Sequence, residues 1–315
     1  MEVIFSHGDA DGICSAALLY SKYTTAKLWI TTPVGLLKDL RSCDAERVFI
    51  CDIAISERDK DPLFEEFKRI SDDGELVYVD HHPLPLHTLT SDIPSSKIVW
   101  DTWKSASELV FRFSGEEGWS HLALFGAIAD YRDSTEFVIR KLDYYDKRTI
   151  SLEAGLLSQC LGASRGDYAF KKEVIKDLGD GKMPSNMHRV VDRAISATKK
   201  EWRLYEYVSE NVKRMDGIAV VSAPNGLSPT KAAKFAIGAA ESPVGICAQH
   251  KNDHVDISVR KRSDLSLNLD YALRTIAPRL GGSGGGHESA AGARVPADRL
   301  EDLIKMLSKE VYAAL

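Results

Sequence analysis

Four apolar residues run directly into three polar ones in Leu76-Val77-Tyr78-Val79-Asp80-His81-His82. The apolar run has the length and the β-branched and aromatic content of a buried strand, so we expect a strand that ends at the polar triplet. A carboxylate and two imidazoles in that position are typical metal ligands, although histidines beside a strand can also serve as capping or hydrogen-bonding groups. The triplet predicts a polar site at the edge of a sheet.

Two further strand ends carry the same residue types. The segment His7-Gly8-Asp9-Ala10-Asp11-Gly12 and the pair Cys51-Asp52 each follow an apolar run. Asp9 and Asp11 stand two residues apart on a segment that leaves a strand, so both carboxylates can point into one crevice. Gly12 allows the sharp turn into the next helix. Together the three segments predict a shared metal centre, whereas an isolated Asp-x-Asp-Gly is usually only a turn.

Short β-rich runs alternate with helical patterns over the first half of the chain. The expected strands cover residues 3–5, 27–30, 47–50, 76–79 and 97–100. The expected helices cover residues 13–23, 36–41, 62–70, 105–113 and 122–131. Buried strands that alternate with helices predict an α/β fold with a doubly wound, mainly parallel sheet. Ligands of such sheets gather beyond the carboxyl ends of the strands, where the polar segments lie.

Turn-forming residues at 179–184 predict a boundary between two domains. We divide the chain into residues 1–182, a connector at 183–215 and a smaller α/β domain at 216–315. The stretch 187–214 has no Gly or Pro and is predicted to form one long helix. The last domain contains the glycine-rich stretch 281–287, which we expect to be a loop. Its backbone N–H groups could hold a phosphate, although such a segment is more often only a flexible turn.

The amino-acid composition argues for a soluble globular protein and against a membrane protein or a disulfide-rich one. The chain has 315 residues, of which 44% are hydrophobic and 28% charged, as is ordinary for a soluble globular protein. No apolar run approaches the roughly 20 residues that span a bilayer, and no basic leader opens the sequence, so we expect a cytoplasmic protein without a membrane partner. The five cysteines form no CxxC pair, which argues against a disulfide framework or a zinc site.

Acidic residues are concentrated where the polar segments lie. Residues 1–186 hold 22 Lys and Arg against 31 Asp and Glu, while the whole chain has a net charge of -5. Two divalent cations would reverse the local field, so an anionic substrate is not excluded. A mixed Asp and His set suits Mn²⁺, with Mg²⁺ as a competitor. Two such ions can activate a water and stabilise the charge that develops when a phosphodiester is cleaved.

Five segments together resemble one family of enzymes. They are SHGDADG (6–12), CDIA (51–54), VDHHP (79–83), GAIAD (126–130) and GGSGGGHESAAG (281–292). This combination is similar to the DHH phosphoesterase superfamily with its C-terminal DHHA1 domain, over nearly the whole chain. Within that superfamily the spacing H-x-D-x-D-G resembles the archaeal RecJ-like single-strand exonucleases, including the helicase-associated type. The chain would then be a core of two domains without additional ones.

The resemblance assigns roles to particular residues. It implies metal ligands at His7, Asp9, Asp11, Asp52, His81 and Asp130, with Asp52 as the bridging ligand. It implies a catalytic set of His82, Asp52 and Asp80, in which His82 faces the scissile phosphate and Asp80 orients a histidine. In the second domain it implies substrate binding by Arg260, Gly284, Gly285, Gly286 and His287. An ordinary exposed strand arginine is the alternative reading of Arg260.

The function that follows is a phosphodiesterase with two Mn²⁺ or Mg²⁺ ions. We expect an exonuclease that threads single-stranded DNA or RNA between its domains and releases mononucleotides by metal-activated water. The resemblance suggests 3′ to 5′ polarity, a role in DNA repair, and a DNA helicase or replication proteins as partners. The alternative is a phosphodiesterase for short oligoribonucleotides (nanoRNA) or cyclic dinucleotides. A third reading, an inert binding module, conflicts with the intact set of candidate ligands.

Overall fold

The computed structural model describes residues 1–115, 117–222 and 227–315 and divides into two compact units. The first unit covers Met1–Thr198 and the second covers Lys199–Leu315. The division falls within the long helix α9 (His188–Asn211), which lies in the segment 183–215 predicted as a connector. The predicted boundaries at 182 and 215 stay a prediction.

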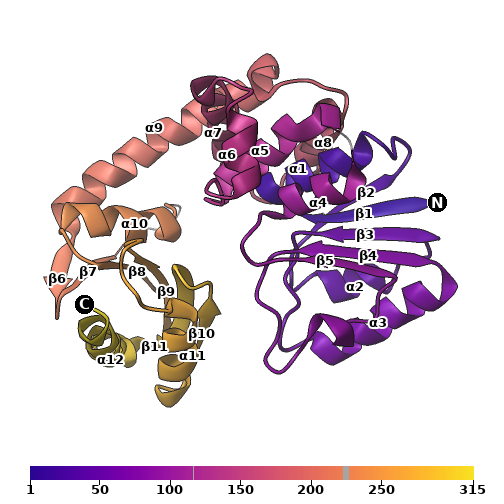
Figure 1. Cartoon of the computed structure of the whole chain (residues 1–315). Helices are drawn as coiled ribbons and strands as arrows, with labels where there is room; N and C mark the ends of the chain where they lie inside the picture. The colour runs from indigo at the N-terminus through magenta and orange to yellow at the C-terminus, as the bar shows by residue number, and fades with distance from the viewer. Residues whose placement is uncertain (116, 223–226) are drawn as a thin grey trace. The chain divides into compact units, whose positions relative to one another are not determined.

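A parallel sheet of five strands forms the centre of the first unit (Figure 1). Its order is β2-β1-β3-β4-β5, and every neighbouring pair is parallel. The strands are β1 (Glu2–His7), β2 (Lys27–Thr31), β3 (Arg47–Cys51), β4 (Glu75–Asp80) and β5 (Lys97–Trp100). All five lie where the sequence predicted strands, and the prediction of a mainly parallel α/β sheet is confirmed.

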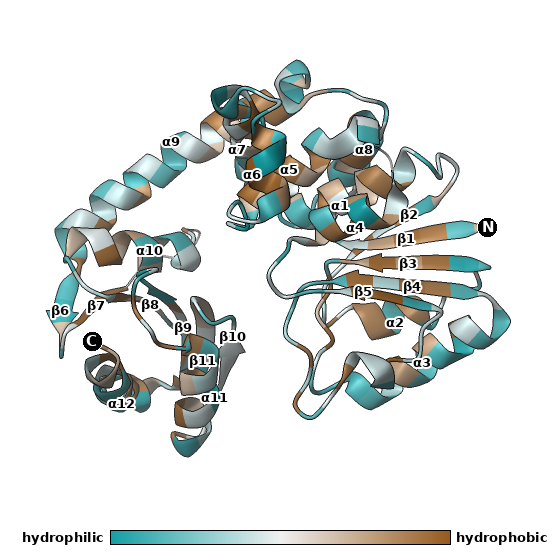
Figure 2. Ribbon diagram, in the orientation of Figure 1, coloured by the Kyte–Doolittle hydropathy of each residue, from teal (hydrophilic) through white to brown (hydrophobic). Residues whose placement is uncertain are grey.

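Helices cover both faces of this sheet, as Figure 1 shows. The helices are α1 (Ala10–Tyr20), α2 (Leu36–Leu40), α3 (Lys60–Asp73), α4 (Ala106–Ser114), α5 (Ser120–Ala129), α6 (Glu136–Leu142), α7 (Lys147–Ala163) and α8 (Tyr168–Gly179). The last three lie in a region where the sequence analysis placed no element. Alternate residues of β1 face opposite cores, since Ile4 packs with α1 and α5 whereas Val3 and Phe5 pack with α2 and α3. Figure 2 shows brown, apolar strands between helices whose outer sides are teal and polar.

The crossover connections place the polar segments at one point of the sheet. The chain leaves β1 through α1, which covers one face, and reaches β3 and β4 through α2 and α3, which cover the other face. Because β1 and β3 are neighbours in the sheet, their outgoing segments part and leave a crevice at their carboxyl ends. His7 and Asp52 lie at these two ends.

The second unit contains a mixed sheet of six strands in the order β10-β11-β9-β8-β7-β6. Only the β7–β8 pair is parallel among its described pairs. The strands are β6 (Lys213–Met215), β7 (Ile218–Ser222), β8 (Val244–His250), β9 (His254–Lys261), β10 (Ser283–Gly286) and β11 (Ala290–Pro296). The helices are α10 (Pro229–Ala239), α11 (Leu269–Arg279) and α12 (Leu300–Ala313). Side chains of α10 pack on one face of the sheet, and those of α11 and α12 pack on the other.

One local prediction for this region is wrong, and one predicted helix is present but ends earlier than expected. The glycine-rich stretch was expected to be a loop, but residues 283–286 form the edge strand β10, which pairs antiparallel with β11. Gly282 and Gly284 permit close backbone packing, since an added Cβ would lie 2.0 Å from the carbonyl oxygen of Arg294 or 2.8 Å from that of Leu273. The predicted helix 187–214 ends at Asn211, and the chain then enters β6.

Two further observations complete the fold. The five cysteines are all buried. Of the helices in the described ranges, none has both the length and the apolar character that crossing a membrane would require.

Candidate metal centre

The end of β1 and the start of α1 present three of the predicted ligands. His7 is the last residue of β1, Asp9 is the N-cap of α1, and Asp11 lies in the first turn of that helix. The Asp9 side chain accepts a hydrogen bond from the Gly12 backbone N–H at 3.0 Å, which fixes the carboxylate at the helix start. An added Cβ on Gly12 would lie 2.4 Å from the His7 carbonyl oxygen, so this tight turn requires glycine.

Two groups of side-chain donor atoms, each within 4.8 Å of one another, contain the six predicted ligands, and a third such group joins Asp52 and His81 to Asp80 and His82. Of the first two groups, one is His7, Asp9 and Asp52, and the other is Asp11, His81 and Asp130. Asp52 reaches both, because its Oδ2 lies 3.8 Å from His7 Nδ1 and its Oδ1 lies 3.2 Å from His81 Nε2. The positions of these atoms suit one carboxylate shared between two cations.

The surroundings of the Asp52 carboxylate indicate whether a cation would fit between the two groups of predicted ligands. Its Oδ2 is buried and, within the described ranges, has no hydrogen-bond partner. A buried carboxylate oxygen without a donor is unfavourable, and a divalent cation would compensate for that loss. Asp52 also has a φ of 59°, a left-handed conformation that aspartate and asparagine tolerate better than most residues. The residues present therefore fit a divalent metal.

Asp11 is held by the N-terminus of a neighbouring helix. Its two carboxylate oxygens accept hydrogen bonds from the backbone N–H groups of Ala106 at 2.7 Å and Ser107 at 2.9 Å, in the first turn of α4. The partial positive charge of a helix N-terminus favours an anion there. Gly126 on α5 leaves the space, since an added Cβ would lie 2.5 Å from Asp11 Oδ1. The rigid orientation of Asp11 thus depends on two other helices.

The three residues Asp80, His81 and His82 at the end of β4 have different surroundings. Asp80 is fully buried, accepts a hydrogen bond from the Tyr78 hydroxyl at 2.8 Å, and lies 2.8 Å from His82 Nδ1. His81 is also buried and belongs to the ligand group with Asp11 and Asp130. The His82 side chain remains 21% exposed, so of the three it is the one that can meet a substrate. Asp80 can act on a substrate only through His82.

Burial and mutual repulsion control the charges of the aspartates that are predicted to bind metal. Burial, followed by the carboxylates of Asp9 and Asp11, raises the pKa of Asp52 well above its usual range. Burial, again followed by Asp11 and Asp9, raises the pKa of Asp130 to about 7. For Asp9 burial is again the largest single effect, but the hydrogen bond with His7, the charge of His7 and the hydrogen bonds with Asp52 and Gly12 together outweigh it and hold the pKa of Asp9 well below its ordinary value. Metal binding must therefore expel protons from part of this cluster.

We expect the stabilisation by a divalent cation to grow with pH. In the metal-free protein Asp130 retains its proton until the pH passes about 7, whereas its ordinary pKa is 3.8. The folded state then binds more protons than the unfolded chain in this window, so metal-free stability falls as the pH rises. A cation binds only the ionised carboxylates. Melting temperatures with and without Mn²⁺, at about pH 5.5 and about pH 7.5, should show the larger gain at the higher pH.

The variant Asp130→Asn provides the control for this experiment. It lacks the titrating carboxyl group, so its gain in melting temperature should be smaller and should depend less on pH. An equal gain at both pH values in the unchanged protein would contradict the expectation.

Several residues that contact this centre received no role from the sequence. Lys171 on α8 is 6% exposed, and its Nζ donates to the Gly8 carbonyl oxygen at 2.5 Å, across 163 positions of the chain. Burial lowers its pKa, and the carboxylate of Asp9 opposes that effect. Arg132 Nε lies 3.6 Å from Asp130 Oδ2. No local pattern marks these cations, but Tyr78 could have been noticed, because it precedes Asp80 by two residues and so shares its face of the strand.

The predicted substrate-binding residues lie on one region of the second unit. Arg260 on β9 is paired in register with Ala290, and the backbone N–H of His287 donates to the Ala290 carbonyl at 2.8 Å. This brings Arg260 and His287 to the same end of the sheet. The backbone N–H of Gly286 already donates to Asp270 Oδ1 at 2.6 Å. Gly284 and Gly285, in contrast, line a hollow.

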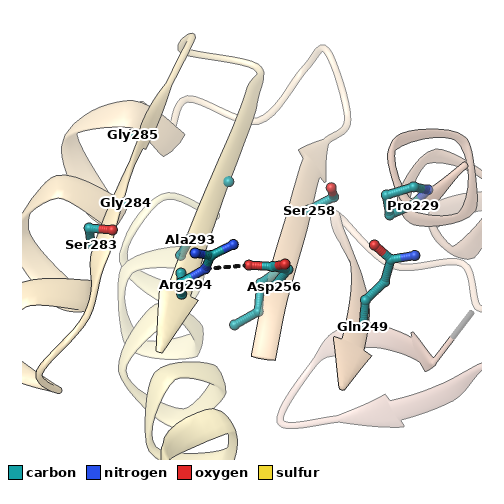
Figure 3. A pocket seen from close by; sticks show the side chains of 11 residues that line it. Pro229, Gln249, Asp256, Ser258, Ser283, Gly284, Gly285, Ala293 and Arg294 are labelled. Atoms are coloured by element: carbon teal, nitrogen blue, oxygen red, sulfur yellow. Dashed lines mark hydrogen bonds and ion pairs between the residues drawn. The ribbon is translucent and has the colours of Figure 1, made fainter. Parts of the chain in front are cut away.

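That hollow is an open pocket of about 500 Å³ over β8, β9, β11 and β10 (Figure 3). Its polar lining includes Gln249 and Ser258, together with an ion pair in which Arg294 Nε lies 2.6 Å from Asp256 Oδ1. Arg260 and His287 are not among its lining residues. The structure therefore groups the five predicted residues into one pair at the sheet end, two glycines in the pocket and Gly286 beside Asp270.

Two family profiles match this sequence. The profile described as "DHH family, N-terminal domain" matches residues 2–130, and that described as "DHHA1 domain" matches residues 219–313. The first range contains every predicted metal ligand, and the second contains Arg260 and the glycine-rich stretch. None of the curated protein sequences matches this one.

Solved structures share the fold at low sequence identity. A pGpG-specific phosphodiesterase, PggH from Vibrio cholerae, superposes with a TM-score of 0.62 and 14% identity over 100% of this chain and 99% of that one. RecJ from Thermus thermophilus, solved with Mn²⁺, superposes with a TM-score of 0.68 and 15% sequence identity, over 99% of this chain and 52% of that one. An exopolyphosphatase-related protein from Bacteroides fragilis superposes with a TM-score of 0.57 and 15% sequence identity, over 99% of this chain and 91% of that one. At these identities the likeness concerns the fold.

Proposed function

This chain is a metal-dependent phosphoesterase of the DHH family that carries a DHHA1 domain, and from this membership we propose that it is an exonuclease for single-stranded nucleic acid. The observation that supports the proposal is the position of Asp52 at the carboxyl edge of the first sheet, with its two carboxylate oxygens 3.8 Å from His7 and 3.2 Å from His81, which belong to separate groups of potential ligands. When bound there, two divalent cations supply an activated water and neutralise charge on the phosphate. RecJ, one of the structural neighbours, was solved with Mn²⁺, which supports that metal as the first to test.

The protein's own residues would hold the cations and position the scissile phosphate. We assign His7 and Asp9 to one cation, Asp11, His81 and Asp130 to the other, and Asp52 to both. His82 would face the scissile phosphate. Burial opposes its charge, but the Asp80 carboxylate raises the pKa of His82 to about 9, so it carries a proton at neutral pH. A protonated imidazole can donate to a phosphate oxygen or to the leaving oxygen. Asp80 would position His82 without touching the substrate.

The second unit would contribute groups that bind the substrate. We assign this role to Arg260, Gly284, Gly285, Gly286 and His287. The period of β9 places Arg260 on the same face as Ser258 and Asp256, which line the open pocket. A guanidinium can hold a phosphate through two parallel hydrogen bonds, which an ammonium group cannot imitate.

Replacing Arg260 by Gln should raise KM roughly tenfold and leave kcat nearly unchanged, because a group that binds substrate and transition state alike affects binding alone. Steady-state cleavage of a short labelled strand measures both constants. Arg299→Gln serves as the control, since Arg299 is an exposed arginine of the same unit that pairs with Asp302. A fall in kcat at constant KM would contradict the assigned role.

The function itself is tested by digestion of DNA and RNA strands that carry a label at the 5′ or at the 3′ end. With Mn²⁺ or Mg²⁺ we expect mononucleotides to be released from single strands, with 3′ to 5′ polarity. The shrinking ladder from a 5′ label and the immediate loss of a 3′ label would report that polarity. The absence of cleavage with either metal would reject the proposal. A DNA helicase or replication protein is the kind of partner we propose, in keeping with a role in DNA repair.

A second candidate is a phosphodiesterase for very short RNA or cyclic dinucleotides. It is favoured by one observation, since the superposition on the pGpG-specific phosphodiesterase covers 99% of that chain, whereas the superposition on RecJ covers 52% of its chain. Turnover of a dinucleotide and of a long single strand should be compared at equal concentrations of ends. A strong preference for the dinucleotide would select this second function.

A further inference from the structure

An exposed tyrosine occupies a strained position directly after the ligand Asp130. Tyr131 lies in the turn between α5 and α6, with a φ of 57° and 90% of its surface exposed. A side chain with a Cβ is unfavourable in this left-handed conformation, for which glycine is the usual residue. Tyr131 gains almost no burial in exchange. The fold therefore has no evident use for this side chain.

The hydrogen bonds of the turn show why its backbone must adopt this conformation. The Tyr131 N–H donates to the Ile128 carbonyl at 3.2 Å, and the Arg132 N–H donates to the Ala127 carbonyl at 2.8 Å. This is the Schellman pattern that ends many helices, with the left-handed residue at the position where glycine is preferred. Helix α4 ends in that preferred way, at Gly115 with a φ of 72°. At the end of α5, by contrast, an aromatic ring extends into solvent.

The strain alone does not imply a ligand, as a second turn of the same kind demonstrates. Glu241 follows α10 with a φ of 47°, and its N–H and that of Ser242 donate to Gly238 and Ile237 in the same pattern. Glu241 is charged and well solvated, so its exposure is unremarkable. Tyr131 differs because it exposes an apolar ring and is bonded to a residue whose carboxylate lies 3.6 Å from His81 Nδ1.

We propose that the Tyr131 ring stacks on a nucleobase of the substrate, next to the phosphodiester held at the metal centre. This inference rests on the proposed nuclease function and deepens it by naming what is recognised: the planar base, in addition to the phosphate. An aromatic face accepts any base, so the contact would favour single strands, whose bases are available, without selecting a sequence. The turn sets the direction in which the side chain leaves the backbone, and the 90% exposure of Tyr131 leaves the face of its ring available.

The test is a double-mutant cycle between the protein and the substrate. Cleavage is measured for the unchanged protein and for Tyr131→Gly, on a short single strand and on strands with one abasic nucleotide at the first or second position from either end. Tyr131→Gly should lower kcat/KM on the intact strand roughly tenfold, mainly through KM. At one abasic position the same variant should have almost no effect, because the partner of the ring is already missing. Tyr131→Phe and Tyr131→Trp should keep the activity.

Glu241→Gly is the matched control for backbone strain. Both glycine variants remove a Cβ from the same kind of turn, so neither should lower the melting temperature, and only Tyr131→Gly should change kcat/KM. Equal losses by Tyr131→Gly on intact and abasic strands would overturn the proposal, as would a loss in Tyr131→Phe, which keeps the ring. If the unchanged protein cleaves no strand, the proposed function fails before Tyr131 is tested, and the two failures are thereby distinguished.

Discussion

Asp52→Asn should reduce phosphodiester hydrolysis by roughly 10³-fold or more at saturating Mn²⁺, because several kcal/mol of charge stabilisation by metal ions would depend on this residue in its proposed role as the shared ligand. The substitution suits the site. Asparagine tolerates the φ of 59° at this position and keeps the volume of the side chain. The amide has one neutral oxygen in place of two anionic ones, so one ligand group loses its donor from this residue and the other keeps only an uncharged oxygen. Turnover of a labelled strand and the number of Mn²⁺ ions bound per chain measure the effect.

The stability of the same variant separates a chemical effect from unfolding. Burial and two neighbouring carboxylates raise the pKa of Asp52, so its ionised form is unfavourable in the metal-free protein. Asp52→Asn places a group that cannot ionise at this position, so its metal-free melting temperature should equal or exceed that of the unchanged protein. Asp44→Asn is the control, since Asp44 is 95% exposed in the same unit. Full metal-dependent activity in Asp52→Asn would contradict the assigned role.

His82→Ala should lower kcat by roughly 10²-fold to 10⁴-fold, the range usual for the loss of a positioned acid or base. KM should change little, because the residues proposed to hold the substrate elsewhere are untouched. Metal binding should also persist, since His7, His81 and the aspartates remain. An unchanged kcat would show that His82 does not meet the reacting phosphate.

Asp80→Asn tests the coupling between His82 and its buried neighbour. The carboxylate holds the pKa of His82 at about 9, against the burial that would lower it. Without that negative charge His82 loses its proton at lower pH, so the alkaline limb of the kcat profile should move to lower pH. The profile of kcat against pH for both proteins measures the shift. Two superimposable profiles would exclude Asp80 as the residue that orients and charges His82.

Much of the first unit could be predicted because its signals are local. Each strand is a short apolar run, and the alternation with amphipathic helices is sufficient for a parallel sheet with ligands at its carboxyl edge. The glycine-rich stretch was misread for a physical reason. Glycine usually indicates a turn, but here Gly282 and Gly284 allow an edge strand to pack closely on Arg294 and on Leu273 of α11. Such contacts between distant segments leave no periodic pattern.

The candidate site was predictable only in part, for the same reason. Its acidic and histidine residues follow strands and could be grouped from the sequence, although the roles assigned to them stay predictions. The groups that support them could not be found. Asp11 depends on two backbone N–H groups of α4, 95 and 96 positions away, and Lys171 contacts Gly8 from α8. Backbone donors have no residue type that a sequence could display.

The amino-acid sequence alone establishes the α/β sheet, the place of the polar segments at its edge and the resemblance to the DHH family, because all three depend on short segments and their order. Only the tertiary structure determines the protonation states at the site, since burial and distance decide which carboxylates keep a proton. It separates fully buried Asp80 from His82, and it leaves the Tyr131 ring in solvent on a strained turn. These properties arise from long-range packing, which fixes the surroundings of each side chain.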